Sequence, residues 1–284
     1  MSKILACIDA SPYATSVCDL TAWLASRLNA DVELLHVVQR TSAVATRHDY
    51  SGAIGLGVKS ELLEELTRIE EAQGRFAVQS GRALLDAAQA RVGASAAGKI
   101  EPVHLHGGII ETILEREAHA ELVVMGKRGA SGQFATAHIG SKIERVLRAG
   151  KKPLVVAPQE FLPPDDVVIA YDGSRSILRA LEYVAGSPIF DGMPIQLVMA
   201  GAQSEAHRAE LERAVLAVAV NGRKASWSLL PGAPDTVIAN FMADRSKSML
   251  VMGSHGHSPL RTLIVGSTTT AVIRAVHAPI LLIR

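Results

Sequence analysis

Three blocks of sequence occur twice in this chain, in the same order, and this internal repeat limits the fold more than any other feature. The blocks are KILACIDAS (3–11) and VVIAYDGS (167–174), ELVVMGKRGAS (121–131) and SMLVMGSHGHS (248–258), and IGSKIERVLRAGKKPLVVAP (139–158) and VGSTTTAVIRAVHAPILLIR (265–284). Ordered self-similarity of this kind indicates a duplicated domain. The sequence predicts one repeat over 1–158, a connector with paired prolines over 159–164, and a second repeat over 165–284.

Each repeat alternates short aliphatic runs with segments of helical periodicity, which is the pattern of βα units. The runs predict strands at 3–9, 32–38, 100–105, 121–125 and 153–157, and again at 167–171, 195–200, 225–230, 248–252 and 279–283. Apolar residues make up 48% of the chain and aromatic ones only 4%, so Ala, Val, Leu and Ile must build the core. Continuous aliphatic strands are typical of parallel sheets with helices on both faces. We therefore expect two α/β domains, each with a five-stranded parallel sheet flanked by helices.

Charge, cysteine content and hydropathy restrict the class of partner. The formal net charge is +1, which gives no strong field to attract nucleic acid or an anionic membrane. The two cysteines, Cys7 and Cys18, form no C-x-x-C pair and are interpreted as reduced thiols. The N-terminus lacks the apolar core of a signal peptide, and no apolar stretch approaches the roughly 20 residues of a membrane span. A cytoplasmic protein that binds neither nucleic acid nor membrane is expected.

The starts of two helices and one insertion can also be predicted. Ser11, followed by Pro12, and Ser174 each stand where a helix N-cap is expected after the first strand of a repeat. The first repeat has extra length after its second strand, with a glycine-rich stretch at 51–57 and a charged helix near 60–93. We interpret this insertion as a loop followed by a solvated helix. A lid over the first site is the less favoured alternative.

A glycine-rich connection between a strand and a helix carries the chemistry of the second repeat. Gly253 and Gly256 follow an aliphatic strand, and Gly266-Ser267-Thr268 opens a helix, in the spacing Gly-x2-Gly-x9-Gly-Ser-Thr. Glycines let backbone N–H groups approach an anion, and the helix start adds free amides, hydroxyls and the positive end of a dipole. The carboxyl end of a parallel strand is also where open α/β sheets bind ligands. The pattern is neither a Walker A motif nor a G-x-G-x-x-G fingerprint.

These residues resemble those of tandem universal stress proteins over essentially the whole chain. The resemblance rests on the first-strand Asp of DAS (9–11) and DGS (172–174), on HVV (36–38), and on the glycine connection. It implies adenine-nucleotide α-hydrolase-like domains that pair through their last strands, so that one chain forms an intrachain pseudo-dimer. It also implies binding of ATP or ADP, with or without Mg²⁺. Further association of two chains into a homodimer is compatible with this pattern.

The resemblance nominates equivalent nucleotide-binding residues in the two repeats. In such a site the Asp lies near ribose and adenine, the end of the second strand meets the base, and the glycine connection holds phosphates. For the second repeat the candidates are Asp172, Ala200, Gly253, His255, Gly256, Gly266, Ser267 and Thr268. For the first they are Asp9, Val37, Gly126, Arg128, Gly129, Gly140 and Ser141.

The first repeat departs from the pattern in two places. Ten residues separate Gly129 from Gly140, and Lys142 stands where the second repeat has Thr268. The extra residue either forms a bulge or displaces Gly140, and Lys127, Arg128 or Lys142 are candidates to neutralise phosphate. Motif integrity therefore favours nucleotide binding in the second repeat.

Some of the singled-out aspartates and histidines also have purely structural interpretations. Asp9 and Asp172 are also well placed to cap the helix that follows each of them. His104 and His106 share one face of a strand at metal-ligand spacing, but no further ligand is close in sequence.

Three hypotheses for function follow. The leading one is a non-enzymatic, nucleotide-responsive stress protein with an unidentified protein partner. The second is a nucleotide-free structural or signalling module. The third, an ATP-pyrophosphatase-type enzyme, needs a Ser-Gly-Gly-x-Asp-Ser loop that the sequence lacks, so at most slow ATP hydrolysis is expected.

Overall fold

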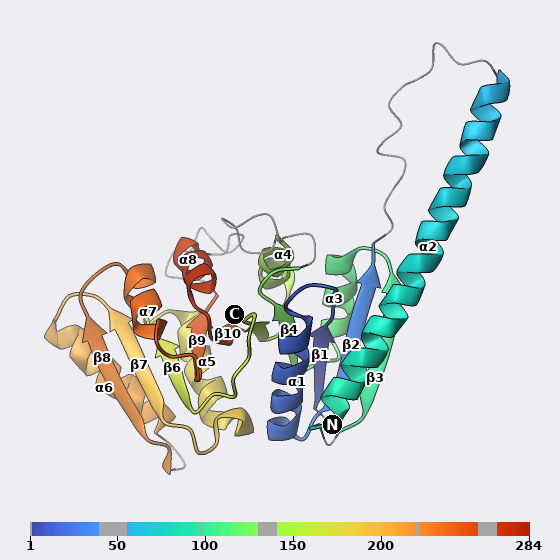
Figure 1. Ribbon diagram of the computed structural model, residues 1–284. Coiled ribbons are helices and arrows are strands. Elements are labelled where there is room, and N and C mark those ends of the chain that lie inside the picture. The colour runs from blue at the N-terminus through green and yellow to red at the C-terminus, as the bar shows by residue number, and fades with distance from the viewer. Residues whose placement is uncertain (1, 40–55, 97, 130–140, 220–221, 255–265) are drawn as a thin grey trace.

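The structure is a computed structural model that describes residues 2–39, 56–96, 98–129, 141–219, 222–254 and 266–284 (Figure 1). The strands of the first repeat are β1 (Lys3–Cys7), β2 (Asp31–Val38), β3 (Ile100–His106), β4 (Leu122–Gly126) and β5 (Leu154–Ala157). Those of the second are β6 (Asp166–Ala170), β7 (Ile195–Ala200), β8 (Ala225–Leu230), β9 (Ser248–Gly253) and β10 (Ile280–Ile283). Each predicted strand is present within a few residues of its expected bounds.

Helices connect the strands in both repeats. In the first they are α1 (Ala14–Leu28), α2 (Leu56–Gly93), α3 (Ile109–Glu117) and α4 (Ser141–Ala149). In the second they are α5 (Arg175–Gly186), the short η3 (Pro188–Phe190), α6 (Glu205–Val218), α7 (Pro234–Met242) and α8 (Ser267–Ala275). Among the described residues, no helix is both long enough and apolar enough to cross a bilayer.

All ten of these strands form one continuous sheet, in the order β3-β2-β1-β4-β5-β10-β9-β6-β7-β8. Within each repeat the five strands are parallel, as predicted. The two halves meet where β5 pairs with β10 in the antiparallel sense, with Val155 opposite Leu281. We call this pairing the seam. Because it is antiparallel, the carboxyl ends of the strands point to opposite edges of the sheet in the two repeats.

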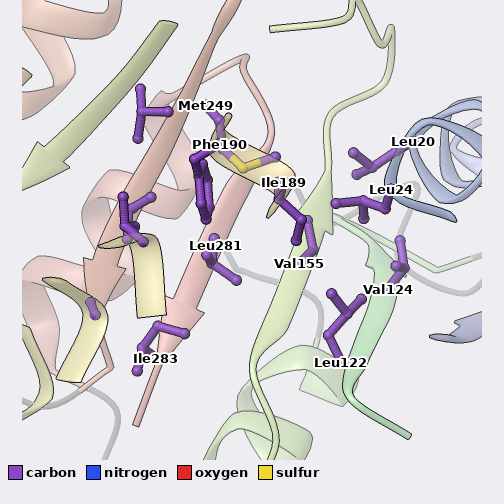
Figure 2. Packing of buried hydrophobic residues seen from close by; sticks show 14 of the residues in the cluster. Leu20, Leu24, Leu122, Val124, Val155, Ile189, Phe190, Met249, Leu281 and Ile283 are labelled. Carbon is purple, nitrogen blue, oxygen red and sulfur yellow. The ribbon is translucent and has the colours of Figure 1, made fainter. Parts of the chain in front are cut away.

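The core has one layer on each face of the sheet, and both layers run across the seam. One cluster joins Leu20 and Leu24 of α1 to Phe190 of η3 and to Val155 and Leu281 of the seam (Figure 2). The other joins buried residues of α3 and α4 to those of α7 and α8. Residues of both repeats therefore share each core, which favours folding of the chain as one unit.

The first helices of the two repeats begin differently. Ser174 is the N-cap of α5, and its Oγ accepts a hydrogen bond from the backbone N–H of Ile177, as predicted. The corresponding prediction for Ser11 is wrong, because α1 begins only at Ala14, with Tyr13 at the N-cap. Ser11 Oγ instead accepts from the N–H of Tyr13 at 3.3 Å. A turn thus precedes the helix in the first repeat.

Helix α2 is the long charged helix that the sequence predicts, and it starts four residues before the expected 60. Its second half packs on β2, β3 and α1, whereas its first half continues beyond the sheet (Figure 1). Phe76, near the middle of the helix, is 72% exposed. The segment 40–55, which includes most of the glycine-rich stretch, lies outside the described residues.

Candidate functional site

The two first-strand aspartates adopt the same local arrangement at the carboxyl edge of their repeats. Asp9 Oδ1 accepts a hydrogen bond from the N–H of Ser11 at 3.3 Å, and Asp172 Oδ1 accepts from the N–H of Ser174 at 3.0 Å. These bonds close the turn between the first strand and the first helix of each repeat. Both carboxylates therefore lie at the carboxyl ends of the first strands, before the first helix of each repeat.

The first glycine of each connection has a packing role. A Cβ atom at Gly126 would lie 2.6 Å from Tyr13 Cβ, just before α1. A Cβ atom at Gly253 would overlap Ser176 Oγ in the first turn of α5. Both glycines therefore let the end of β4 or β9 approach the start of the neighbouring helix, and neither needs an anion to explain it.

In the first repeat, Gly129 brings three elements together. A Cβ atom there would lie 2.9 Å from Asp9 Oδ2, after β1, and 3.5 Å from Lys142 Nζ, in the first turn of α4. The structure thus places the candidate aspartate, the glycine connection and a lysine side by side. Lys142 is therefore available to offset the charge of Asp9 or of an incoming phosphate.

The start of α8 provides the corresponding feature in the second repeat. Gly266 is its N-cap in an extended conformation, and Ser267 and Thr268 are exposed in the first turn. The first N–H groups of a helix have no partner within the helix, so this turn presents free donors and the positive end of the helix dipole. Such a terminus is suited to bind an anion.

The ends of the second strands lie as predicted, beside groups that the sequence does not single out. Val37 and Ala200 are half-buried near the carboxyl ends of β2 and β7. In the second repeat, Glu210 of α6 accepts a hydrogen bond from the Tyr171 hydroxyl at 3.2 Å. Burial and this carboxylate raise the pKa of Tyr171 to about 12.

Gly173 explains how Glu210 comes so near the candidate site. Its φ of +69° favours glycine, and any Cβ there would overlap Glu210 Oε1. Glu210 is thus a carboxylate next to Asp172 that sequence reasoning missed. A single glutamate on an amphipathic helix gives no signal that it faces the turn after β6.

Lys127 does not belong to the phosphate site, which corrects one of the alternatives offered for the first repeat. Its side chain is buried, and Nζ donates to the carbonyl oxygens of Arg274 at 2.7 Å and Val276 at 2.9 Å. These carbonyls lie at the C-terminal end of α8, in the other repeat. The lysine therefore caps a helix across the seam instead of facing a ligand.

Several nominated residues lie outside this description. His255, Gly256 and Gly140 are not among the described residues, and Ser141 is placed only as the first residue of α4. Arg128 is half-buried two residues after β4. Within the described ranges, no three His, Cys, Asp or Glu side chains gather where they could hold a metal ion.

A five-stranded parallel sheet with a glycine-rich connection at its carboxyl edge, present twice and joined through the last strands, defines a tandem protein of the adenine-nucleotide α-hydrolase-like fold. The profile of the universal stress protein family matches residues 1–158 and 164–284. The chain therefore belongs to the universal stress protein family.

Individual relatives agree with this assignment. A universal stress protein of Synechocystis is 31% identical over 287 residues, with 100% of both chains covered. One from Mycobacterium tuberculosis is 24% identical, with 98% of this chain and 93% of the relative covered. Among solved structures, a universal stress protein from Archaeoglobus fulgidus superposes with a TM-score of 0.74 at 21% identity, over 99% of this chain and 98% of that one.

Proposed function

We propose that this stress-response protein binds ATP or ADP at the carboxyl edge of the second repeat and acts without catalysis, as a nucleotide-responsive regulatory or protective module. The observation that carries the proposal is the start of α8, where exposed Ser267 and Thr268 surround free backbone amides. A phosphate chain gains several charge-assisted hydrogen bonds at such a terminus. Membership of the family supports the same assignment.

The remaining candidates are proposed to contact the ribose, the adenine and the rest of the phosphate chain. Asp172 is exposed just after β6, and its carboxylate is of a type suited to accept hydrogen bonds from ribose hydroxyls. The backbone at Ala200, where β7 ends, is available to the adenine edge. Gly256 and His255 complete the proposed phosphate loop, and Mg²⁺, where it accompanies the nucleotide, would bind mainly through phosphate oxygens.

The first repeat is proposed as the weaker site. Its connection is one residue longer, and Asp9 lies against Gly129, where the second repeat has Gly256. Lys142 and Arg128 offset this negative charge, so the site takes anions but with a different arrangement of donors. Val37, Gly126, Gly140 and Ser141 are its remaining candidates.

Calorimetric titration of the full chain with ATP tests the assignment. Gly266→Val should weaken binding by about tenfold or more, because it blocks the approach of phosphate to the helix start. The fold should tolerate this change, since φ at Gly266 is −57° and the nearest atom to an added Cβ is Thr269 Oγ1 at 3.4 Å. Gly140→Val should have a smaller effect. Gly186→Val, at the end of α5 with no atom within 4 Å, is the matched control.

Two outcomes would replace the proposal by an alternative function. Unchanged ATP affinity in Gly266→Val would remove the second repeat as the site. No adenine nucleotide in mass spectra of denatured protein, together with no rise in melting temperature on adding ATP, would favour a nucleotide-free module. Phosphate release proportional to protein and lost in Gly266→Val would instead identify a slow ATPase.

A further inference from the structure

Three histidines lie together at the carboxyl ends of β2 and β3, on the face that α2 covers. His36 and His104 are partners in the strand register, and their ring centroids are 5.4 Å apart. His106 continues the row, 5.5 Å from His104. In the second repeat the corresponding register partners are Met199 and Leu229. The fold itself therefore does not require histidines at these positions.

Helix α2 is adapted to this histidine row. A Cβ atom at Gly81 would lie 2.6 Å from His104 Nε2 and 2.8 Å from His36 Cδ2, so only glycine lets the helix backbone rest on the two rings. His36 Nδ1 is hydrogen-bonded to the carbonyl of Ile8 at 2.8 Å. His104 Nε2 is buried and has no hydrogen-bond partner in the described part of the chain. The central histidine of the row thus has a buried ring nitrogen under α2 without a described hydrogen-bond partner.

A cleft opens beside the row, between α2 and the end of β3. Its volume is about 810 Å³, and its lining includes Arg75, Gln79 and Arg82 of α2 together with His106 of β3. This volume lies within the range of small-molecule sites. Much of the exposed lining is apolar, but its charged side chains are more often positive than negative, with Arg75 and Arg82 against the single carboxylate of Glu71.

The two arginines of the cleft have no counter-charge bound to them among the described residues. Neither Arg75 nor Arg82 forms an ion pair with any described residue, although Glu71 stands one turn from Arg75. The positive surroundings extend inward: burial, together with His36, His106 and Arg82, lowers the pKa of His104. Two forked guanidinium groups beside an imidazole form a donor set that matches phosphate oxygens.

We propose that this cleft is a second ligand site, which binds a small phosphorylated molecule through Arg75, Arg82 and His106. It lies at the β3 edge of the sheet, separated by β2 from the strand that precedes Asp9, and thus is distinct from the glycine-connection site. Gln79 provides a neutral donor and acceptor, and Glu71 an acceptor for a ligand hydroxyl. The described residues of the second repeat do not form such a site, because Met199 and Leu229 replace the histidine pair and α6 (Glu205–Val218) is much shorter than α2.

The test is calorimetric titration of the full chain with inorganic pyrophosphate and, separately, with a sugar bisphosphate. Both should bind, and Arg75→Ala/Arg82→Ala should weaken binding by about tenfold or more, as expected for loss of charge-assisted bonds. The control is Arg68→Ala/Arg179→Ala, which removes the same charge from exposed positions outside the cleft and should leave affinity unchanged. Tighter binding of the sugar bisphosphate would identify an organic metabolite, and tighter binding of pyrophosphate an inorganic ligand.

Two further measurements separate this site from the proposed nucleotide site. The proton NMR signal of the His106 ring should shift on adding either probe, also in the Gly140→Val/Gly266→Val protein. Binding that is lost in that protein but kept in Arg75→Ala/Arg82→Ala would overturn the proposal, because the probe would then occupy the glycine connections. The proposal would also be overturned if Arg68→Ala/Arg179→Ala weakened probe binding as much as Arg75→Ala/Arg82→Ala does, or if neither probe bound.

Discussion

At the scale of single residues, helix ends in one repeat are completed by cations from the other. Lys127, just after β4, donates to two carbonyls at the end of α8. Arg284, just after β10, donates to the carbonyl of Gly150 at 2.7 Å, at the end of α4. A positive group is favourable at a helix C-terminus, where carbonyls lack partners within the helix. The two cations therefore connect the repeats beyond the hydrogen bonds of the seam.

Lys127 also makes stability depend on pH in a defined window. Burial first, and then the neighbouring Arg128, lower the pKa of Lys127 from 10.5 to about 8. Between these values the unfolded chain binds the proton more tightly than the native one, so the free energy of unfolding rises as the pH increases from about 8 toward 10.5. Lys127→Met should flatten this rise, as measured by urea denaturation across the window.

Lys152→Met, which removes a lysine next to β5 without this burial, serves as the control and should retain the wild-type slope. An identical slope in Lys127→Met would show that Lys127 keeps its ordinary proton affinity in the folded protein. The prediction concerns the slope, because at neutral pH the loss of two hydrogen bonds opposes the removal of a buried charge.

The sequence predicts the local setting of some candidate residues but not their partners on other elements. The aspartate turns and the start of α8 follow from local pattern, so they could be predicted. The contact between Lys127 and Val276 joins residues 149 positions apart. Such a contact depends on how the two repeats pair, and a lysine beside a glycine connection reads more simply as a phosphate ligand. Glu210 is missed for a different reason, since its neighbour Gly173 belongs to the same repeat but to another element.

At the scale of elements, the strands are the most predictable part of the fold. Buried parallel strands must be continuous aliphatic runs, so β1 and β6 can be read directly from Ile4–Ala6 and Val167–Ile169. Helix starts are less predictable, because a serine after a strand can close a turn instead of capping a helix. Ser11 does the former and Ser174 the latter.

The packing of α2 on the histidine row gives a prediction for that helix. Gly81→Ala should destabilise the protein by about 1–3 kcal/mol, because the added Cβ would press on His104 and His36. Gly74→Ala on the same helix has no atom within 4 Å of the added Cβ and should stabilise by about 0.5–1 kcal/mol. Chemical denaturation of the two variants measures both effects.

A second substitution distinguishes a steric cause from a change in helix propensity. Replacing His104 by Ala should recover much of the stability that Gly81→Ala loses, since it removes the nearest atoms. If Gly81→Ala is as stabilising as Gly74→Ala, α2 does not rest on the histidines and the origin of the neighbouring cleft must be reconsidered.

At the scale of the whole molecule, the shared cores predict that the two repeats unfold together. The chain has two tryptophans, Trp23 in α1 and Trp227 in β8, so each repeat has its own fluorescence probe. Trp23→Phe and Trp227→Phe variants isolate the two signals. Their urea transitions should coincide, because the core cluster through Leu281 and Val155 spans both repeats.

Leu281→Lys should uncouple the halves. The residue is 1% exposed at the centre of the seam, and a charge there has no partner. The two tryptophan transitions should then separate, with the larger loss of stability in the second repeat. Leu178→Lys, at an exposed position of α5, is the control and should leave them coincident. If the two tryptophan signals already gave separate urea transitions with Leu281 in place, coupling through the shared core would be refuted.

The antiparallel seam has a consequence for how the protein can diversify. In a dimer of identical chains, every mutation appears twice, once in each subunit. Here the subunits are consecutive segments of one chain, so a mutation alters one half while its counterpart stays intact. Two differences are of this kind. Lys127 in the first repeat corresponds to Ser254 in the second, and His36 and His104 correspond to Met199 and Leu229. A single chain with two repeats thus keeps the architecture of a symmetric pair without requiring its two halves to stay alike.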